Sequence, residues 1–339
     1  MKKCAPRALV TQSRAVGSTV LAMSMSDPLI TVPPVMKMKI LRVAGWCAML
    51  AGLAHAEDAL ETARASVGSK LPCADSEVVR YTAHRVARPM VIDGKLDEPA
   101  WKLAPASSRY VDILTGAPVI HDTRAKIVWD DQDLYLGIRV EEPSVRATFT
   151  KENSPIYEEN DVEVFIAGPD AYYELEVNAL NTTYEVFFLW GSAYERAGFA
   201  AAPGFARKNL VPFNGVGFTT HPRGPRLGHF GWHFPGKRTA VFVDGTLNDD
   251  RDRDRGWTVE IALPWAGMKW LSPDGKPGAP KDGDVWRIDL SRFNTYKEAP
   301  PAKDSGGWVL SPHRVWDSHV PECFPYIRFS TAEAPAPKP

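Results

Sequence analysis

Alternating acidic and apolar side chains mark residues 157–178. This period-two pattern predicts two β-strands, and Gly168-Pro169-Asp170 between them predicts the turn of a hairpin. One face of the hairpin is then buried, and the other carries the polar side chains Asp161, Glu163, Glu174, Glu176 and Asn178. Carboxylates on neighbouring strands repel one another, so this face indicates a site where a cationic or hydroxyl-rich ligand binds.

The same carboxylates could instead do catalysis. A glycoside hydrolase needs two carboxyl groups beside the scissile bond, and neighbouring strands could place Glu163 at a suitable distance from Glu174 or Glu176. Carboxylates also occur on sheet faces that are simply solvated. The sequence contains no Gly-x-Ser-x-Gly elbow and no phosphate-binding loop. Binding, hydrolysis and a plain solvated face remain open at this point.

A second acidic run could bind calcium, which takes about six to eight oxygen ligands. It lies at residues 244–254, and the candidate ligands are Asp249, Asp252 and Asp254. The spacing of an EF-hand is missing, however. Interleaved arginines at 251, 253 and 255 could neutralise the aspartates without a metal, so a solvated loop is the alternative reading.

A haem is a further alternative, because axial ligation needs a Met, His or Lys side chain. The candidates lie in or near an irregular region, and no sequence pattern joins them. They are His221, His229, His233 and Met268.

Composition excludes one class of function. The chain has 339 residues, 40 Lys and Arg against 41 Asp and Glu, and a net charge of -1. Charges of both signs are spread throughout, so the basic stripe that nucleic acid requires is missing. The 29 prolines, 25 glycines and 11 tryptophans are typical of a turn-rich β protein with aromatic surfaces.

The N-terminal region resembles an export signal. Basic residues between 37 and 42 precede an apolar run at residues 43–54, and Ala54-His55-Ala56 matches a small-x-small cleavage site. We expect an upstream extension and signal peptide at 1–56, cleavage near Ala56, a periplasmic or extracellular location, and no membrane span in the mature chain. An uncleaved anchor is the alternative, although the run is shorter than the ~20 residues of a span.

Four cysteines are present, and Cys4 and Cys47 leave with the signal segment. Cys73 and Cys323 remain at opposite ends of the mature chain. In an exported protein they could form a disulfide that ties these ends together. Two unpaired thiols are the alternative, and the spacing does not decide between them.

The rest of the chain predicts one all-β domain. We expect a leader at 57–79, the domain at 80–330 and a disordered Ala/Pro-rich tail at 331–339. Short alternating runs recur between Gly- and Pro-rich turns, which favours a two-sheet antiparallel β-sandwich of the jelly-roll or immunoglobulin-like kind. Residues 191–236 break this pattern and predict a long loop over one sheet face.

Several motifs follow one another in a fixed order. They are IDGKLDEPAW at 92–101, AKIVWDD and LYL within 125–136, NDVEVFI at 160–166, YELEVN at 173–178, GWTVEIALPW at 256–265 and YIRF at 326–329. In this order, over roughly residues 85–330, they resemble carbohydrate-binding module family 9 and the wider DOMON-like group. The resemblance implies an exported β-sandwich that binds an oligosaccharide or polysaccharide without cleaving it, in carbohydrate catabolism and alongside glycoside hydrolases. A haem-carrying relative of the same sandwich is the further alternative.

The resemblance also implies the site. Members of the family hold the end of a sugar chain between two aromatic side chains, and the corresponding residues here are Tyr157 and Trp316. The family carboxylate matches Glu163 and the amide matches Asn178, whereas Glu176 stands where characterised binders have a basic residue. A pyranose stacks its C–H face on an aromatic ring, while carboxyl and amide groups bond its hydroxyls. No cofactor is required for such binding, although family members often carry structural calcium.

Overall fold

The computed structural model describes residues 71–87, 90–295 and 303–334. The chain divides into two units, and all described residues belong to the second unit, Ala51–Pro339, whereas the first, Met1–Leu50, contains none. The predicted signal peptide and its cleavage point lie outside the described residues, as do most of the predicted leader and part of the predicted tail. Within the described part, no helix is long and apolar enough to cross a membrane.

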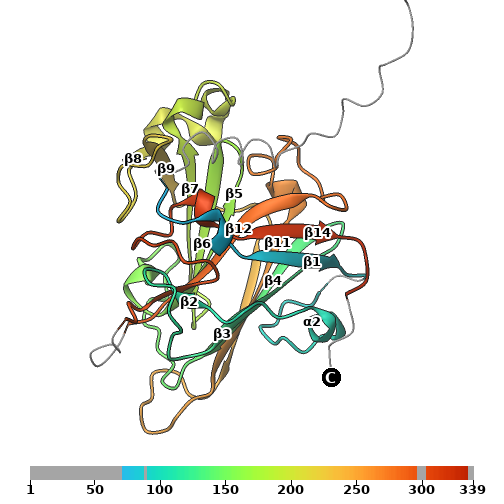
Figure 1. Cartoon of the computed structure of the whole chain (residues 1–339), viewed down its shortest axis with the longest axis vertical. Coiled ribbons are helices and arrows are strands. Elements are labelled where there is room, and N and C mark those ends of the chain that lie inside the picture. Colours follow the sequence, from blue (N-terminus) through green and yellow to red (C-terminus); the bar gives the residue numbers. More distant parts are fainter. Residues whose placement is uncertain (1–70, 88–89, 296–302, 335–339) are drawn as a thin grey trace, which may run out of the picture. The chain divides into compact units, whose positions relative to one another are not determined.

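The described chain consists mostly of β-strands, so the all-β prediction is confirmed (Figure 1). The strands are β1 (Arg80–Arg85), β2 (Val111–Asp112), β3 (Thr123–Trp129), β4 (Asp133–Glu141), β5 (Asp161–Ala167), β6 (Ala171–Asn178), β7 (Thr183–Trp190), β8 (Val211–Phe213), β9 (Arg226–Phe230), β10 (Arg238–Asp244), β11 (Gly256–Pro264), β12 (Val285–Phe293), β13 (Gly307–Val309) and β14 (Tyr326–Ser330). The helical elements are short. They are α2 (Pro99–Leu103) and the 3-10 helices η2 (Asp75–Glu77), η3 (Ile156–Glu158), η4 (Gly191–Ala193), η5 (Phe199–Ala201), η6 (Pro203–Phe205), η7 (Arg207–Asn209), η8 (Trp265–Gly267) and η9 (Pro321–Cys323).

Hydrogen bonds join the described strands into one sheet. The order is β10-β11-β4-β3-β1-β14-β12-β5-β6-β7-β9-β8, and β13 links β12 to β2. The pairs are antiparallel as predicted, except that β1 is parallel to both of its neighbours, β14 and β3. Parallel neighbours need a long crossover connection, and the segment that contains α2 and β2 provides it between β1 and β3. The predicted division into two separate sheets is not confirmed.

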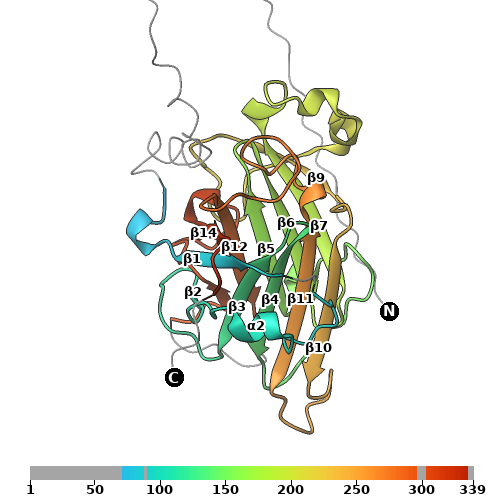
Figure 2. The same ribbon diagram turned by 90° about the vertical axis from the view of Figure 1, so that its right-hand side faces the viewer.

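The region predicted as one long loop, residues 191–236, contains regular structure. Strands β8 and β9 extend the sheet beyond β7, and η4 to η7 gather past the end of β7 (Figures 1 and 2). These elements are three to five residues long, too short for the alternation that reveals a strand in a sequence.

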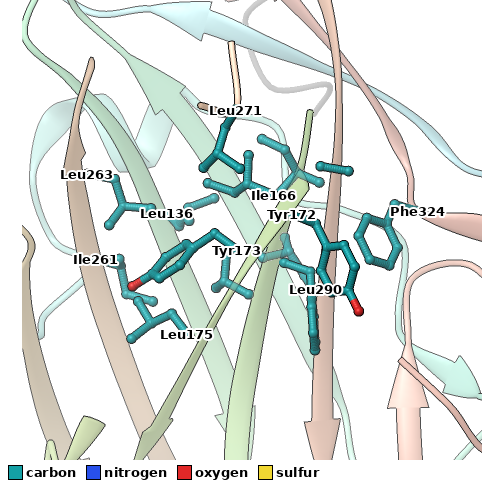
Figure 3. Packing of buried hydrophobic residues seen from close by; sticks show 14 of the residues in the cluster. Leu136, Ile166, Tyr172, Tyr173, Leu175, Ile261, Leu263, Leu271, Leu290 and Phe324 are labelled. Carbon is teal, nitrogen blue, oxygen red and sulfur yellow. The ribbon is translucent and has the colours of Figure 1, made fainter. Parts of the chain in front are cut away.

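One large hydrophobic core takes side chains from distant parts of the strand path. Leu136 of β4 and Ile261 of β11 belong to the same cluster as Tyr173 and Leu175 of β6 (Figure 3). The alternation in β5 places Val162, Val164 and Ile166 in this core. The opposite face of β5 and β6 therefore carries the acidic side chains, as the sequence predicted.

The Asp-Gly turn near the start of the domain is fixed by Glu260 of β11. Its Oε2 accepts hydrogen bonds from the backbone N–H groups of Asp93 (2.8 Å) and Gly94 (2.9 Å), and its Oε1 accepts one from Nε1 of Trp101 (2.7 Å). Trp101 is fully buried in the short helix α2, which begins at Pro99. Gly94 has φ +89°, and a Cβ there would lie 2.5 Å from the carbonyl carbon of Val241, so the turn requires glycine.

Cys73 and Cys323 form a disulfide, with their Cα atoms 5.9 Å apart. Both cysteines are buried and pack against Val320. The bond joins the segment before β1 to η9, which precedes β14.

Candidate functional site

The acidic face of β5 and β6 is not open to solvent. In the hairpin register Glu163 lies opposite Glu176, and Asp161 lies opposite Asn178. The side chains of Asp161, Glu163, Glu174, Glu176 and Asn178 are all buried, with exposed fractions of 5 % or less. The reading of this face as a plain solvated surface is therefore wrong, because other segments of the chain lie over it.

A cavity of about 330 Å³ remains between this face and the segments above it. Its floor is formed by Glu163, Glu174 and Glu176. The other lining residues are mostly aromatic, and they are Tyr157, Tyr184, Phe188, Phe213, Val216, Phe230, Phe293, Trp316, Asp317, Ser318 and His319. Lys and Arg are missing from this lining.

Two aromatic pairs stand on opposite sides of the floor. Tyr157 packs edge-to-face on Tyr184 of β7, with ring centroids 5.5 Å apart, and Trp316 packs edge-to-face on Phe293 of β12, at 5.3 Å. Strands β5 and β6 lie between β12 and β7 in the sheet, so the two pairs flank the carboxyl groups. Tyr157 is 51 % exposed and Trp316 is 39 % exposed, which leaves part of each side chain free to contact a ligand.

The floor carboxyls have few partners. Oγ of Ser291 donates to Oε2 of Glu163 at 3.0 Å, and Oε1 of Glu174 lies 3.7 Å from Nε2 of His319. Oε2 of Glu176 is buried without a hydrogen-bond partner among the described residues. Oxygens of Asp161, Glu163 and Glu176 lie within 4.8 Å of one another.

Burial therefore acts strongly on the protonation of these groups. It raises the pKa of Glu163 to about 8, against the opposing hydrogen bond from Ser291 and with added repulsion from Asp289. Burial, with repulsion from neighbouring carboxylates, also holds the pKa values of Glu174 and Glu176 well above their ordinary range. At neutral pH the floor consequently keeps protons and can donate as well as accept hydrogen bonds.

The loop that carries Trp316 is held in place by Asp317. Oδ2 of Asp317 accepts hydrogen bonds from the N–H groups of Val216, Gly217 and Phe218, and Oδ1 accepts one from the N–H of His319. Burial alone would raise the pKa of Asp317, but His319 and these hydrogen bonds keep it below its ordinary value. Asp317 thus links residues 216–218 to the loop that carries Trp316, and both segments line the cavity with the acidic floor.

Asn178 was predicted to contact the ligand, and the structure places it elsewhere. Its Nδ2 donates to the carbonyl of Phe149 and to Oε1 of Glu159, and its Oδ1 accepts from the N–H groups of Leu180 and Thr182. Asn178 does not line the cavity. It lies at the end of β6, where the neighbouring turn uses both of its polar groups.

The predicted calcium ligands each have partners within the protein. Asp249 pairs with Arg251, Asp252 accepts from Oγ1 of Thr246, and Asp254 accepts from the N–H groups of Val145 and Thr246. Among the described residues, the acidic and histidine clusters that could hold a metal do not include these three. The structure thus gives each of the three a role in loop structure, and calcium binding by Asp249, Asp252 and Asp254 stays a prediction.

The four haem candidates do not line the cavity either. His221 is buried with Nε2 2.9 Å from Oε2 of Glu322, and Met268 is buried in the main core. His233 is exposed beside Glu152, and His229 packs on Trp232. The described structure therefore gives these four residues separate structural settings.

Several lining residues were missed from the sequence. Tyr184 lies opposite Glu176 in the register of β6 and β7, so period-two counting could have found it. Phe293 lies at the end of β12, opposite Asp161. Phe213 and Phe230 belong to the region predicted as a loop, and no sequence signal points to them.

Fold and site together define an all-β protein with an aromatic-walled, acidic cavity. Residues 92–196 match the family model described as carbohydrate family 9 binding domain-like, so the resemblance to that family is confirmed over this segment. The matched segment contains Tyr157, Glu163 and Glu176 but ends before Trp316.

Several solved structures are similar to this chain. A Bacteroides uniformis protein for which carbohydrate binding is suggested shares 16% identity, covers 75% of this chain and 100% of its own, and superposes with a TM-score of 0.51. Family 9 modules from Caldicellulosiruptor kristjanssonii are also similar, each at 16% identity. The cellotriose complex covers 77% of this chain and 98% of its own with a TM-score of 0.41, and the glucose complex covers 75% and 98% with 0.40. No curated protein matches the chain.

Proposed function

We propose that this chain binds the end of an oligosaccharide or polysaccharide in the cavity between Tyr157 and Trp316, without cleaving it. The observation that carries the proposal is the placement of these two partly exposed rings on either side of Glu163 and Glu176. Sugar rings stack their C–H faces on aromatic side chains, and carboxyl groups bond their hydroxyls. The family match at 92–196 supports the same class of ligand.

The size of the cavity favours a chain end. Its volume of about 330 Å³ lies near the lower limit of small-molecule pockets, which is about 300 Å³. Strands β5 and β6 close it below, so a long polysaccharide would enter with one end.

The wider setting is part of the proposal. The export signal predicted before residue 57 and the disulfide between Cys73 and Cys323 fit the periplasm or the exterior, where disulfides persist. There the protein would act beside glycoside hydrolases in carbohydrate catabolism. We also propose that the strands from β10 to β3 in the sheet order and those from β14 to β8 form two facing layers of a sandwich. Side chains of both groups of strands belong to one core.

The first test is calorimetry with sugars selected on a glycan array. We expect Trp316→Ala to weaken binding at least about tenfold, which is the loss of about 1.4 kcal/mol, because an aromatic stacking surface disappears. Phe242→Ala is the matched control, since Phe242 is 41 % exposed on β10 and does not line the cavity. Equal affinities of Trp316→Ala and the parent protein would contradict the site.

Hydrolysis is the second candidate function, and the raised pKa of Glu163 beside Glu176 is the observation that favours it. Against it, both carboxyls rise from one floor, with oxygens within 4.8 Å, rather than from two sides of a bond. A reducing-sugar release assay distinguishes the two functions. Release by the parent protein that Glu163→Gln abolishes would replace binding by hydrolysis.

A further inference from the structure

The lining of the cavity is rich in acidic side chains and poor in basic ones. Glu163, Glu174 and Glu176 share its floor, Asp161 lies behind them, and the lining contains neither Lys nor Arg. His319 is the one basic side chain in the lining, and burial lowers its pKa to about 3, so it is uncharged at neutral pH. The one remaining acid in the lining, Asp317, is bonded by four backbone N–H groups.

Neutral hydroxyls alone do not require such a floor. Amide side chains would bond the same hydroxyls, and they would avoid the repulsion between adjacent buried acids. Glu176 lines the cavity, and its buried Oε2 has no hydrogen-bond partner in the described part of the chain. This unpaired acceptor indicates that a small shift of the side chain would let a donor on the ligand bond it.

The aromatic side chains next to Glu176 suit a positive charge. Tyr184 lies directly opposite Glu176 in the strand register, and Tyr157 packs on Tyr184. An ammonium group near aromatic rings is attracted by their π-electrons, and a carboxylate adds a charge-assisted hydrogen bond. The two attractions meet at the side of the cavity formed by Glu176, Tyr184 and Tyr157.

We infer that the preferred ligand is a saccharide carrying a protonated amino group, whose ammonium binds Glu176 and Glu163 beside Tyr157 and Tyr184. This inference rests on the proposed function, since the sugar ring still stacks between Tyr157 and Trp316. The ammonium supplies several N–H donors, and its positive charge stabilises the carboxyls in their ionised form.

A divalent metal fits the lining less well. Calcium prefers about six to eight oxygen ligands, whereas the lining is mostly aromatic and only three carboxyl groups come together at the floor. An organic cation uses both the rings and the carboxyls, and a metal uses the carboxyls alone.

Binding of an ammonium is also linked to protons. The groups around Glu176 are Asp161, Glu163 and Glu174 together with Tyr157 and Tyr184. Because burial keeps protons on the carboxyls, an arriving positive charge favours their ionised form, so protons leave the protein on binding.

Titration calorimetry at pH 6, where an ordinary amine is protonated, tests the inference with the full chain. The probes are a fully deacetylated glucosamine trimer, its N-acetylated form and cellotriose, each measured in buffers of different ionisation heat. We expect the glucosamine trimer to bind at least tenfold more tightly than the other two, with proton release to the buffer. Glu176→Gln should bring the ratio of these affinities close to one.

Two controls keep the result interpretable. Glu158→Gln removes an exposed carboxylate beside Tyr157 that does not line the cavity, and it should preserve the preference. Glu174→Gln is the second floor variant if Glu176→Gln unfolds at a lower temperature, and it should also reduce the ratio.

The outcomes separate the two proposals. Equal affinity for the glucosamine trimer and cellotriose overturns the amino-sugar inference and leaves sugar binding intact. Absence of binding by any sugar overturns both. Calcium added alone that binds the parent protein, but not Glu176→Gln, overturns the ammonium assignment in favour of a metal.

Discussion

Acidic side chains define the chemistry of the cavity at the scale of single residues. Asp161, Glu163, Glu174 and Glu176 are buried on two adjacent strands. The protein interior solvates charge poorly, so such groups destabilise a fold unless they hold protons or find partners. The raised pKa values of all four carboxyls indicate that these groups hold protons.

Glu163 makes one contribution to the dependence of folding stability on pH. Its pKa is about 8 in the folded protein and 4.5 ordinarily. Between these values the unfolded chain has lost a proton that the folded chain keeps, so the contribution of Glu163 to stability falls as the pH rises. We expect the stability of Glu163→Gln relative to the parent protein to increase from pH 5 to pH 8, by at least about 1.4 kcal/mol, one pKa unit.

Urea unfolding of both proteins at the two pH values measures this change. Taking the difference removes groups that Glu163 does not influence, including His319, whose lowered pKa acts in the opposite direction. Glu163 also raises the pKa values of Asp161, Glu174 and Glu176, so the difference includes their response to its removal. The exposed Glu158→Gln variant should show the same difference from the parent at both pH values. A pH-independent difference for Glu163→Gln would show that its proton is not retained on folding.

The sequence predicted part of the site for a clear physical reason. Alternation fixes which face of a strand a residue occupies, and this put Glu163 and Glu176 together. The same counting placed Asn178 on that face, but it could not show that a turn takes both polar groups of its amide. Nor could alternation reveal that distant segments bury the acidic face, because that depends on loops such as the one fixed by Asp317.

At the scale of elements, the Asp-Gly turn and α2 depend on one carboxyl group of β11. Glu260 accepts hydrogen bonds from the turn at Asp93 and Gly94 through one oxygen and from Trp101 through the other. A single side chain on β11, next to the edge strand β10, therefore holds both the turn and the fully buried indole against the sheet. This explains how a short helix of five residues is kept in place.

Glu260→Gln should lower the free energy of unfolding by about 1–3 kcal/mol, the cost of leaving a buried donor unpaired. Glutamine has one carbonyl oxygen, so its NH₂ group must face either the turn or Nε1 of Trp101, and both are donors. Urea unfolding measures the loss. Asp97→Asn, an exposed change in the same segment, is the control and should leave the midpoint unchanged. An unaltered midpoint in Glu260→Gln would mean that these bonds contribute little.

Elements with clear alternation were predictable, and short or crossing ones were not. The hairpin of β5 and β6 follows directly from its pattern, with the turn at Gly168-Pro169-Asp170. Strands β8 and β9 have three and five residues in a Gly- and Pro-rich region, too few to show a period. The parallel pairing of β1 was also hidden, because alternation gives the face of a strand and not the direction of its neighbour.

For the whole domain, the critical junction is β1. It lies between β3 and β14, so it joins the strands from β10 to β3 in the sheet order to the strands from β14 to β8. Arg80 pairs with Tyr326 in the register, and the hydroxyl of Tyr326 donates to Asp75. The disulfide between Cys73 and Cys323 crosses the same junction, since it links the segment before β1 to η9 before β14.

Breaking this disulfide should therefore weaken the attachment of β1 to β14. It should also remove a covalent constraint on the unfolded chain. Loss of a native disulfide costs about 2–5 kcal/mol, and one kcal/mol corresponds to about 2–4 °C in a domain of 150–250 residues. We expect reductant to lower the melting temperature by at least about 4 °C. The Cys73→Ala, Cys323→Ala double variant should melt at this lower temperature and should not respond to reductant, because the disulfide found in the described residues is gone. A parent protein that melts at the same temperature after complete reduction would show instead that pairing between β1 and β14 holds the junction unaided.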